Sequence, residues 1–196
     1  MPSKSSSVDF IPTSLLKLCL SVFSEIIARL ANLSFSEGIL PTMFKSAAVT
    51  PLLKKPSLDP DNPANYRPIS NLNNISKIID HLFLSQFYPH VTSSPNFNHL
   101  QSAYQPHHST ETALLQTFDD IFCSADCSQP TLLVSLDLSA AFDTIDHSTL
   151  LSRLSTSFGM SSIALAWLTS YLTYHTQIVC IGSVTSAPSM SKKLTK

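Results

Sequence analysis

The sequence predicts an α+β fold, in which helices pack around a small sheet. Helical spacing of apolar residues recurs along the chain, alternates with short β-like runs and shows no internal repeat. In addition, an apolar run over residues 132–136 leads directly into Asp137, as expected for a buried strand. With 196 residues, 43% of them hydrophobic, the chain suits one domain or part of a larger one.

Residues 1–12 form a polar tail, and the first helix is predicted from residue 14 to about residue 35. Thr13 or Ser14 can cap this helix, and Gly38 closes it. Its apolar residues recur at intervals of three and four, at Leu15, Leu18, Val22, Ile26, Leu30 and Leu33. A strand is predicted over residues 47–53, and Pro51 makes it an edge strand or an irregular one.

A proline-rich loop is expected over residues 54–68, followed by a second helix from about residue 74 to residue 88. The apolar face of that helix comprises Ile75, Ile78, Ile79, Leu82 and Phe83. A loop over 89–108 precedes a third helix, which begins at Ser109 or Thr110 and continues to about Phe122. After the strand that ends at Asp137, the expected elements are helices at about 148–157 and 161–173, a β-like run at 176–181 and an aperiodic end.

Composition favours an intracellular chain with part of its surface covered. Charged residues make up 13%, against roughly 25% in an ordinary domain, so a partner or further domain could cover the surface; an ordinary Ser/Thr/Asn-rich surface is the alternative. The net charge of −1 gives no global signature of nucleic-acid binding. The four cysteines form no C-x-x-C pair, which favours reduced thiols over a zinc site. Neither a signal peptide nor a membrane-spanning run is recognisable.

The strand that ends at Asp137 is the strongest functional signal. A buried carboxylate without a partner is costly, and a divalent metal ion would stabilise it. The stretch LVSLDLSAAFDTIDH resembles the first palm motif of the reverse transcriptases of non-LTR (LINE-type, CR1/L2-like) retrotransposons. The resemblance implies an RNA-directed DNA polymerase that acts on an RNA template, a DNA primer and deoxynucleotides. It assigns Mg²⁺ to Asp137 and the Leu138 backbone carbonyl, and it makes Phe142 the residue that selects deoxynucleotides.

A second stretch extends the resemblance toward the N-terminus. FKSAAVTPLLKKPSLDPDNPANYRPISNLNNISKIID is similar to the fingers region of these enzymes, where a Lys and an Arg contact the incoming triphosphate. Those positions correspond here to Lys54 (or Lys55) and Arg67, whose chemistry suits phosphate. QSAYQPHHSTETALL resembles the next block of the family, with Gln105 in place of a basic residue.

The resemblance divides the chain into a polar tail (1–12), a fingers-like region (13–130), a partial palm with the first catalytic motif (131–182) and an irregular tail (183–196). The fold it implies is the fingers and an incomplete palm sheet of a right-hand reverse transcriptase. Later in such enzymes a hairpin with two adjacent Asp residues supplies the other metal-binding carboxylates. After Asp146, however, this chain has no Asp or Glu, and its one Asp-Asp pair, Asp119–Asp120, precedes the motif in a helical pattern.

The sequence therefore predicts a truncated reverse transcriptase segment that is inactive by itself. Two alternatives remain open at this stage. One is a non-catalytic module that binds nucleic acid or protein, and the other is an inert remnant that folds poorly. A hydrolase with Asp137 as nucleophile is a weaker hypothesis, because that class places a second Asp two residues later, where this chain has Ser139.

Overall fold

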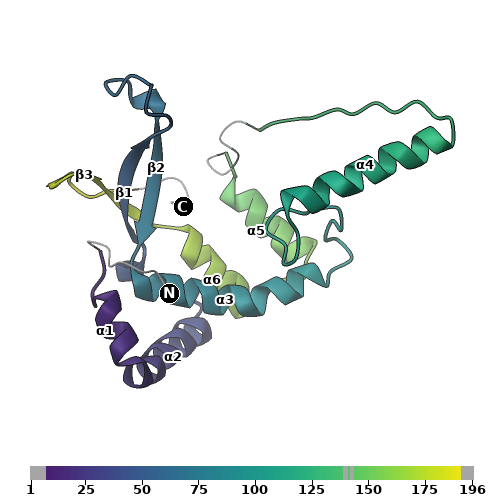
Figure 1. The fold of residues 1–196 in the computed structure, drawn as a ribbon. Helices are drawn as coiled ribbons and strands as arrows, with labels where there is room; N and C mark the ends of the chain where they lie inside the picture. The colour runs from purple at the N-terminus through teal and green to yellow at the C-terminus, as the bar shows by residue number, and fades with distance from the viewer. Residues whose placement is uncertain (1–7, 139–140, 142–143, 191–196) are drawn as a thin grey trace.

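The computed structural model describes residues 8–138, 141 and 144–190, and it is a mixed α/β structure with a small sheet (Figure 1). The helices are α1 (Thr13–Leu18), α2 (Leu20–Glu37), α3 (Asn74–Thr92), α4 (Thr110–Asp126), α5 (His147–Thr156) and α6 (Ser162–Leu172). The strands are β1 (Ser46–Leu53), β2 (Tyr66–Leu72), β3 (Thr176–Ile181), β4 (Val184–Thr185) and β5 (Ser189–Met190). Short 3-10 turns, Thr42–Phe44 and Pro63–Asn65, precede β1 and β2.

The sheet is mixed, with strand order β2-β1-β3-β4 and with β5 paired to β3. β1 pairs with β2 antiparallel, from Ala47 opposite Leu72 to Leu53 opposite Tyr66. β3 runs parallel to β1, but only as far as Val49, which lies opposite Val179. Pro51 therefore lies in the outer half of β1, where β2 is the neighbour and a missing backbone N–H is tolerated.

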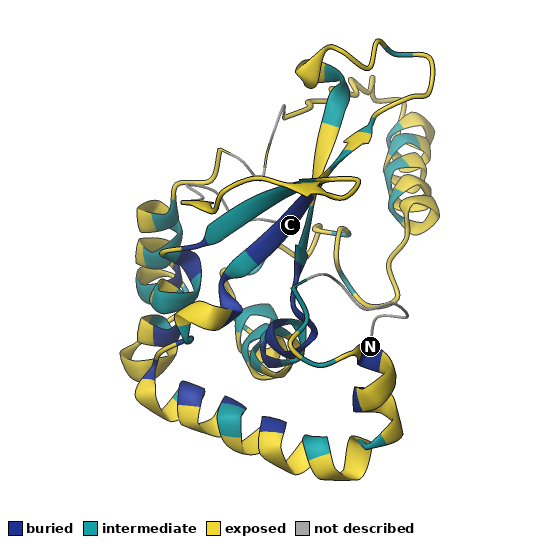
Figure 2. Ribbon diagram, turned by 90° about the vertical axis from the view of Figure 1, so that its left-hand side faces the viewer, coloured by how far each residue is buried: buried dark blue, intermediate teal, exposed yellow. Residues whose placement is uncertain are grey.

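The core lies where α2, α3 and α6 meet the base of the sheet, as the buried residues in Figure 2 show. Trp167 of α6 is its centre, only 2% exposed, and its ring stacks on Phe83 of α3 with centroids 4.1 Å apart. Phe35 of α2 lies edge-on to the same indole, with ring centroids 5.4 Å apart. Tyr171 of α6 also stacks on the indole, with centroids 5.5 Å apart. Aromatic pairs in such geometry add to the stabilisation that burial provides. Trp167 therefore anchors the hydrophobic core.

The single N-terminal helix predicted from the sequence is two helices, α1 and α2, separated at Cys19. The prediction of which face of this region is buried was also wrong. Most of that stripe is exposed, at Leu15, Leu18, Val22, Ile26 and Leu33. The buried positions of α2 are instead Ile27, Ala31 and Ser34. The reason is visible at Ser34, whose hydroxyl accepts a hydrogen bond from the Trp167 indole at 2.8 Å and so brings the small-residue face of α2 inward.

The strand β2 was not predicted, because its residues fall in a region rich in proline. Pro68 can stay in the strand because it lies opposite Pro51, outside the part of β1 that has neighbours on both sides. The helices α3, α4, α5 and α6 and the strand β3 were predicted at nearly their observed positions. Their N-caps follow the expected chemistry: the side chains of Asn73, Ser109 and Asp146 each accept a hydrogen bond from the backbone of the first helical turn.

Candidate functional site

The β1–β2 hairpin brings Lys54 and Arg67 close in the fold, with Arg67 in β2 and Lys54 directly after the end of β1. Arg67 lies directly opposite Leu52, and Lys54 is two residues beyond Leu52. Because directly opposed residues share a face, Leu52 and Arg67 point to the same side, whereas Lys54 lies in the bend that follows β1. All three are exposed, and the hairpin extends away from the helical core (Figure 1). The sequence named both cations, but the missed strand β2 is what places them together.

The two cations differ in how they are held. Lys54 donates its backbone N–H to Asn65 at 2.9 Å and its ammonium to the Ala64 carbonyl at 2.7 Å, so it is tied to the loop. Within the described part of the chain, no hydrogen bond or ion pair engages the Arg67 guanidinium. Arg67 therefore presents its fork of N–H donors to solvent, and such a fork matches the oxygens of a phosphate.

The loop between the strands is ordered by its own polar groups. The Asp59 carboxylate accepts a hydrogen bond from the Asp61 backbone at 3.0 Å, and its carbonyl accepts one from the Asn65 amide at 2.9 Å. The Tyr66 hydroxyl donates to the Pro60 carbonyl at 2.9 Å. These contacts fix the tip of the hairpin, and Lys55 lies exposed within it.

The predicted buried strand that ends at Asp137 is absent, and this prediction is corrected. Residues 131–138 have no regular secondary structure, and none of the described residues is joined to them by a backbone hydrogen bond. Their apolar side chains are 65–89% exposed, and Asp137 is exposed as well. An apolar alternating run favours β structure, but a strand forms only where another strand offers unpaired backbone groups. The desolvation argument for a metal at Asp137 therefore does not apply to this structure.

The described residues do not form a complete metal site around Asp137. No group of three or more His, Cys, Asp or Glu side chains is clustered closely enough to hold an ion in that part of the chain. Leu138 is described and exposed, whereas Phe142 and Asp143 lie outside the described residues. Asp146 is committed to capping α5, with its Oδ1 accepting hydrogen bonds from the Ser148 hydroxyl at 2.5 Å and the Thr149 N–H at 2.7 Å. Those hydrogen bonds, the one from Ser148 foremost, lower the pKa of Asp146 to about 2.

A buried lysine, which the sequence did not single out, joins α6 to the start of the sheet. Lys45 is only 3% exposed, and its ammonium donates to the Ser170 carbonyl at 2.6 Å and to the Ser170 hydroxyl at 3.2 Å. Burial lowers the pKa of Lys45. The Lys45 carbonyl accepts the N–H of Thr176, the first residue of β3, at 3.2 Å. Because its buried charge is held by one carbonyl and one hydroxyl of Ser170 near the C-terminus of α6, this lysine is structural.

A second polar cluster lies next to it, between α3 and the end of α6. The Asp80 carboxyl accepts a hydrogen bond from the Tyr171 hydroxyl at 3.5 Å, and its other oxygen is buried with no hydrogen-bond partner among the residues that the structure describes. Burial raises the pKa of Asp80 to about 7, although the Tyr171 hydrogen bond opposes the shift. His175 is 4% exposed, hydrogen-bonds to the Tyr171 carbonyl and has its pKa lowered, chiefly by burial. The spacing of Asp80 in the sequence could have indicated that it faces the core. It lies one helical turn after Ser76, which is buried, and one turn before Phe83, so the three share a face of α3.

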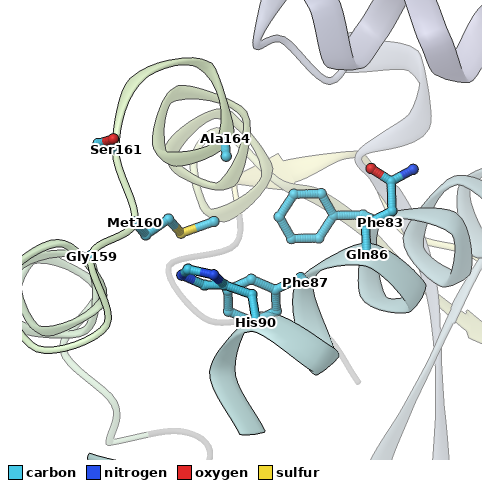
Figure 3. Close-up of a pocket in the computed structure, with 8 residues that line it drawn as sticks. All are labelled: Phe83, Gln86, Phe87, His90, Gly159, Met160, Ser161 and Ala164. Carbon is cyan, nitrogen blue, oxygen red and sulfur yellow. The ribbon is translucent and has the colours of Figure 1, made fainter. Parts of the chain in front are cut away.

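A cavity of about 250 Å³ lies between α3 and the turn that connects α5 to α6 (Figure 3). Its walls are mostly apolar, with Phe83, Phe87 and Met160 facing one another across it, while Ser161 points away. A ring nitrogen of His90 is engaged with the Phe158 carbonyl at 2.7 Å. The cavity is somewhat smaller than typical small-molecule sites, which begin at roughly 300 Å³.

Residues 53–193 match the reverse transcriptase (RNA-dependent DNA polymerase) family. This range includes the β1–β2 hairpin cations and Asp137, and it covers most of the chain, so the chain belongs to this family. Over 158 residues it is also 27% identical to a protein of Drosophila melanogaster described as "Probable RNA-directed DNA polymerase from transposon BS". That match covers 76% of this chain but 16% of the Drosophila protein. The chain is a segment of a retrotransposon reverse transcriptase, as the sequence predicted.

Among the described residues, no helix has both the length and the apolar character required to cross a bilayer.

Proposed function

We propose that this chain is the fingers and initial palm portion of the RNA-directed DNA polymerase of a non-LTR retrotransposon, that its β1–β2 hairpin binds nucleotide phosphates, and that the chain does not polymerise DNA by itself. The observation that carries the proposal is the β1–β2 hairpin, which holds two exposed cations close together: Arg67 in β2 and Lys54 just after β1, where its backbone bonds to Asn65. Family membership over residues 53–193 supplies the nucleic-acid context.

The two cations have distinct roles in this proposal. Arg67 binds two phosphate oxygens through its free guanidinium fork, whereas Lys54, held by Ala64, contributes a fixed positive charge beside them. The ordered hairpin tip supports this role, because side chains that are already positioned lose less conformational entropy on binding. RNA template, DNA primer and deoxynucleotides are the ligands that the family implies.

Asp137 and the Leu138 carbonyl remain the proposed contributors to a Mg²⁺ site, with Phe142 as the proposed residue that selects deoxynucleotides. The donor set within this chain does not complete that site, because no Asp or Glu follows Asp146. Two-metal polymerases need carboxylates that hold both ions. The proposed division into a fingers-like region (13–130) and a partial palm (131–182) is functional rather than physical, because Trp167 of the second part packs in the core of the first.

Binding by the hairpin can be measured with a fluorescently labelled RNA oligonucleotide and anisotropy at several salt concentrations. Arg67→Ala is expected to weaken binding about tenfold, because a hydrogen bond to a charged group contributes roughly 1.5–3 kcal/mol. The slope of the logarithm of the binding constant against the logarithm of the salt concentration should also decrease in magnitude by about one. Arg29→Ala removes an exposed cation on α2 and is the matched control, with binding expected to stay unchanged. Equal affinities for Arg67→Ala and the parent chain would contradict the assignment.

A non-catalytic nucleic-acid-binding module is the alternative, since the exposed Arg67 would serve it equally well. Competition separates the two functions. If the hairpin belongs to a polymerase, a deoxynucleoside triphosphate should displace the part of RNA binding that depends on Arg67. A module that binds RNA alone should retain the RNA at the same triphosphate concentration.

Primer extension tests the absence of synthesis. The purified 196-residue chain is expected to extend no DNA primer on an RNA template, with Mg²⁺ or with Mn²⁺, because it lacks a full set of metal-binding carboxylates. The proposal fails if template-dependent synthesis is observed and is abolished by Asp137→Asn.

A further inference from the structure

Four aromatic rings form a nearly parallel series that runs from the core to the cavity beside α3. In order they are Tyr171, Trp167, Phe83 and Phe87, with consecutive ring planes 14°, 21° and 21° apart. Trp167 is buried in the core, whereas Phe83 and Phe87 are half-buried and line the cavity (Figure 3). The last two rings of the series therefore form part of the cavity wall, where a further flat ring can stack on aromatic surface.

Hydrogen bonds between the end of α3 and the α5–α6 turn hold the cavity walls together. A ring nitrogen of His90 lies 2.7 Å from the Phe158 carbonyl oxygen. The Asn96 side-chain amide donates a hydrogen bond to the Ser157 carbonyl of the same turn. On the opposite wall, Met160 is only 5% exposed and is therefore fixed by its own packing. The cavity is formed before any ligand enters, so binding loses little conformational entropy in the walls.

The cavity combines an apolar interior with a polar mouth. Gln86 and His90 are both exposed at its edge. No hydrogen bond engages the Gln86 amide within the described part of the chain, so its two N–H donors and its carbonyl oxygen are free. A nucleobase has the complementary character, since its faces are apolar and its edge carries hydrogen-bond donors and acceptors. Its faces would lie among the two phenylalanine rings and the Met160 thioether, which also packs favourably on aromatic rings.

Size and charge favour the same ligand. A cavity of about 150 Å³ lined by apolar side chains holds benzene, so the 250 Å³ found here has room for a flat group of one or two fused rings. The chain has a net charge of −1 and offers no broad basic surface to a phosphate backbone. Stacking of a base on aromatic rings needs no cation. All the residues that line the cavity also lie inside the range that matches the reverse transcriptase family.

We propose that this cavity binds one unpaired base of a single-stranded nucleic acid. The base stacks on the Phe83 and Phe87 rings, faces Met160 across the cavity and turns its polar edge toward the Gln86 amide. This contact goes beyond the proposed phosphate binding by the β1–β2 hairpin and is separate from it in space. Phe87 lies 13 residues, or roughly 20 Å, along α3 from Asn74, the first helical residue after β2.

A single-stranded RNA octamer that carries one 2-aminopurine tests the insertion of a base, because stacking quenches the fluorescence of 2-aminopurine. Saturation with the parent chain should quench the emission. The same octamer with an abasic site in place of the 2-aminopurine should bind at least about fivefold more weakly, which is the lower end of what one stacked base contributes. An emission that the parent chain leaves unchanged would overturn the proposal.

Two variants locate the base in the cavity. Phe87→Ala removes the last ring of the series and should weaken binding about tenfold and reduce the quenching. Phe118→Ala, which removes an exposed ring of α4, is the matched control and should change neither. Ala164→Phe fills the cavity from an exposed position of α6 and removes no core contact, so it should abolish the quenching even if Phe87→Ala does not fold. Circular dichroism shows which variants are folded.

Arg67→Ala distinguishes this site from the hairpin. It should lower the affinity for the octamer and leave the quenching at saturation intact, whereas an unchanged affinity would contradict the hairpin assignment alone. Quenching that persists in folded Ala164→Phe would overturn the base site. Binding of the octamer without quenching would also overturn it, and would leave an apolar side chain of a protein partner as the alternative occupant.

Discussion

At the scale of single residues, the burial of the Asp80 carboxyl destabilises the folded state whenever this group is ionised. This carboxyl is packed between α3 and the end of α6, where one oxygen lies near the Tyr171 hydroxyl and the other finds no hydrogen-bond partner in the described part of the chain. Burial raises the pKa of Asp80 from 3.8 to about 7. The folded state therefore binds a proton that the unfolded chain releases at lower pH. The stability that protonated Asp80 provides is fully present below about pH 3.8 and is lost as the pH rises to about 7.

Replacing Asp80 by Asn should remove this pH dependence. The difference in free energy of unfolding between Asp80→Asn and the parent chain is expected to grow with pH between 4 and 7, by up to roughly 4 kcal/mol in favour of Asn. Urea unfolding at several pH values measures this difference. Asp119→Asn, on the exposed surface of α4, is the control and should show no such trend. A difference that stays flat from pH 4 to pH 7 would rule out a proton bound at Asp80.

The candidate site shows how far residue chemistry can be predicted from sequence. Lys54 and Arg67 were identified by resemblance, but their proximity depends on the pairing of β1 with β2, a strand that the prolines concealed. Lys45, Asp80 and His175 were missed because their roles depend on burial between elements distant in the sequence. Asp137 was identified from an apolar run that predicted a buried strand, but it is exposed. Such a run shows a preference for β structure and does not show that a neighbouring strand is present to pair with it.

At the scale of elements, the junction of α2 with α6 depends on Gly38. Gly38 adopts a left-handed conformation with φ of 67° and donates its N–H to the Phe35 carbonyl at 3.3 Å. The next N–H, of Ile39, reaches the Ser34 carbonyl at 3.1 Å, and together the two bonds end α2 in a Schellman motif. A Cβ on Gly38 would lie 3.1 Å from the Ala166 Cβ and 3.2 Å from the Ile163 carbonyl oxygen. The turn and the close packing therefore both require glycine.

Alanine substitutions can separate these two requirements. Gly159 has the same φ of +67° but nothing within 4 Å of the added Cβ, so Gly159→Ala should cost only the backbone strain, about 1–2 kcal/mol. Gly38→Ala should cost about 1 kcal/mol more, because α6 must shift to admit the methyl group. Urea unfolding of both variants gives the comparison. Equal losses would show that α6 accommodates the methyl group freely.

Elements also differ in how well their own residues predict them. The helices α3 to α6 were placed correctly, because capping residues and helical periodicity are local properties. The buried face of α2 was not, since it is decided by Ser34 and Ala31 meeting Trp167, a residue more than 130 positions later. In that case tertiary packing overrides the apolar stripe that the sequence displays.

At the scale of the whole molecule, one core joins the N-terminal helices to the last long strand. Family membership begins at residue 53, yet α2 and the start of β1 pack against α6 and β3, which lie inside the matched range. The parallel pairing of β1 with β3 could not be predicted from local pattern, because a parallel register depends on the whole connection between the strands. The segment most weakly attached to this core is α4 with residues 131–138, whose apolar side chains remain exposed.

The parallel pairing of β1 with β3 also has a consequence for biosynthesis. Ser46, the first residue of β1, pairs with Thr176, the first residue of β3, across a sequence separation of 130 residues. At a translation rate of roughly 5–20 residues per second, β1 leaves the ribosome some 6–26 seconds before its partner. During that interval the hairpin with β2 can form, but the edge of β1 that will receive β3 stays open to other chains. Nascent-chain arrest before residue 176 should therefore yield an aggregation-prone species, in which a chaperone that masks strand edges has time to bind.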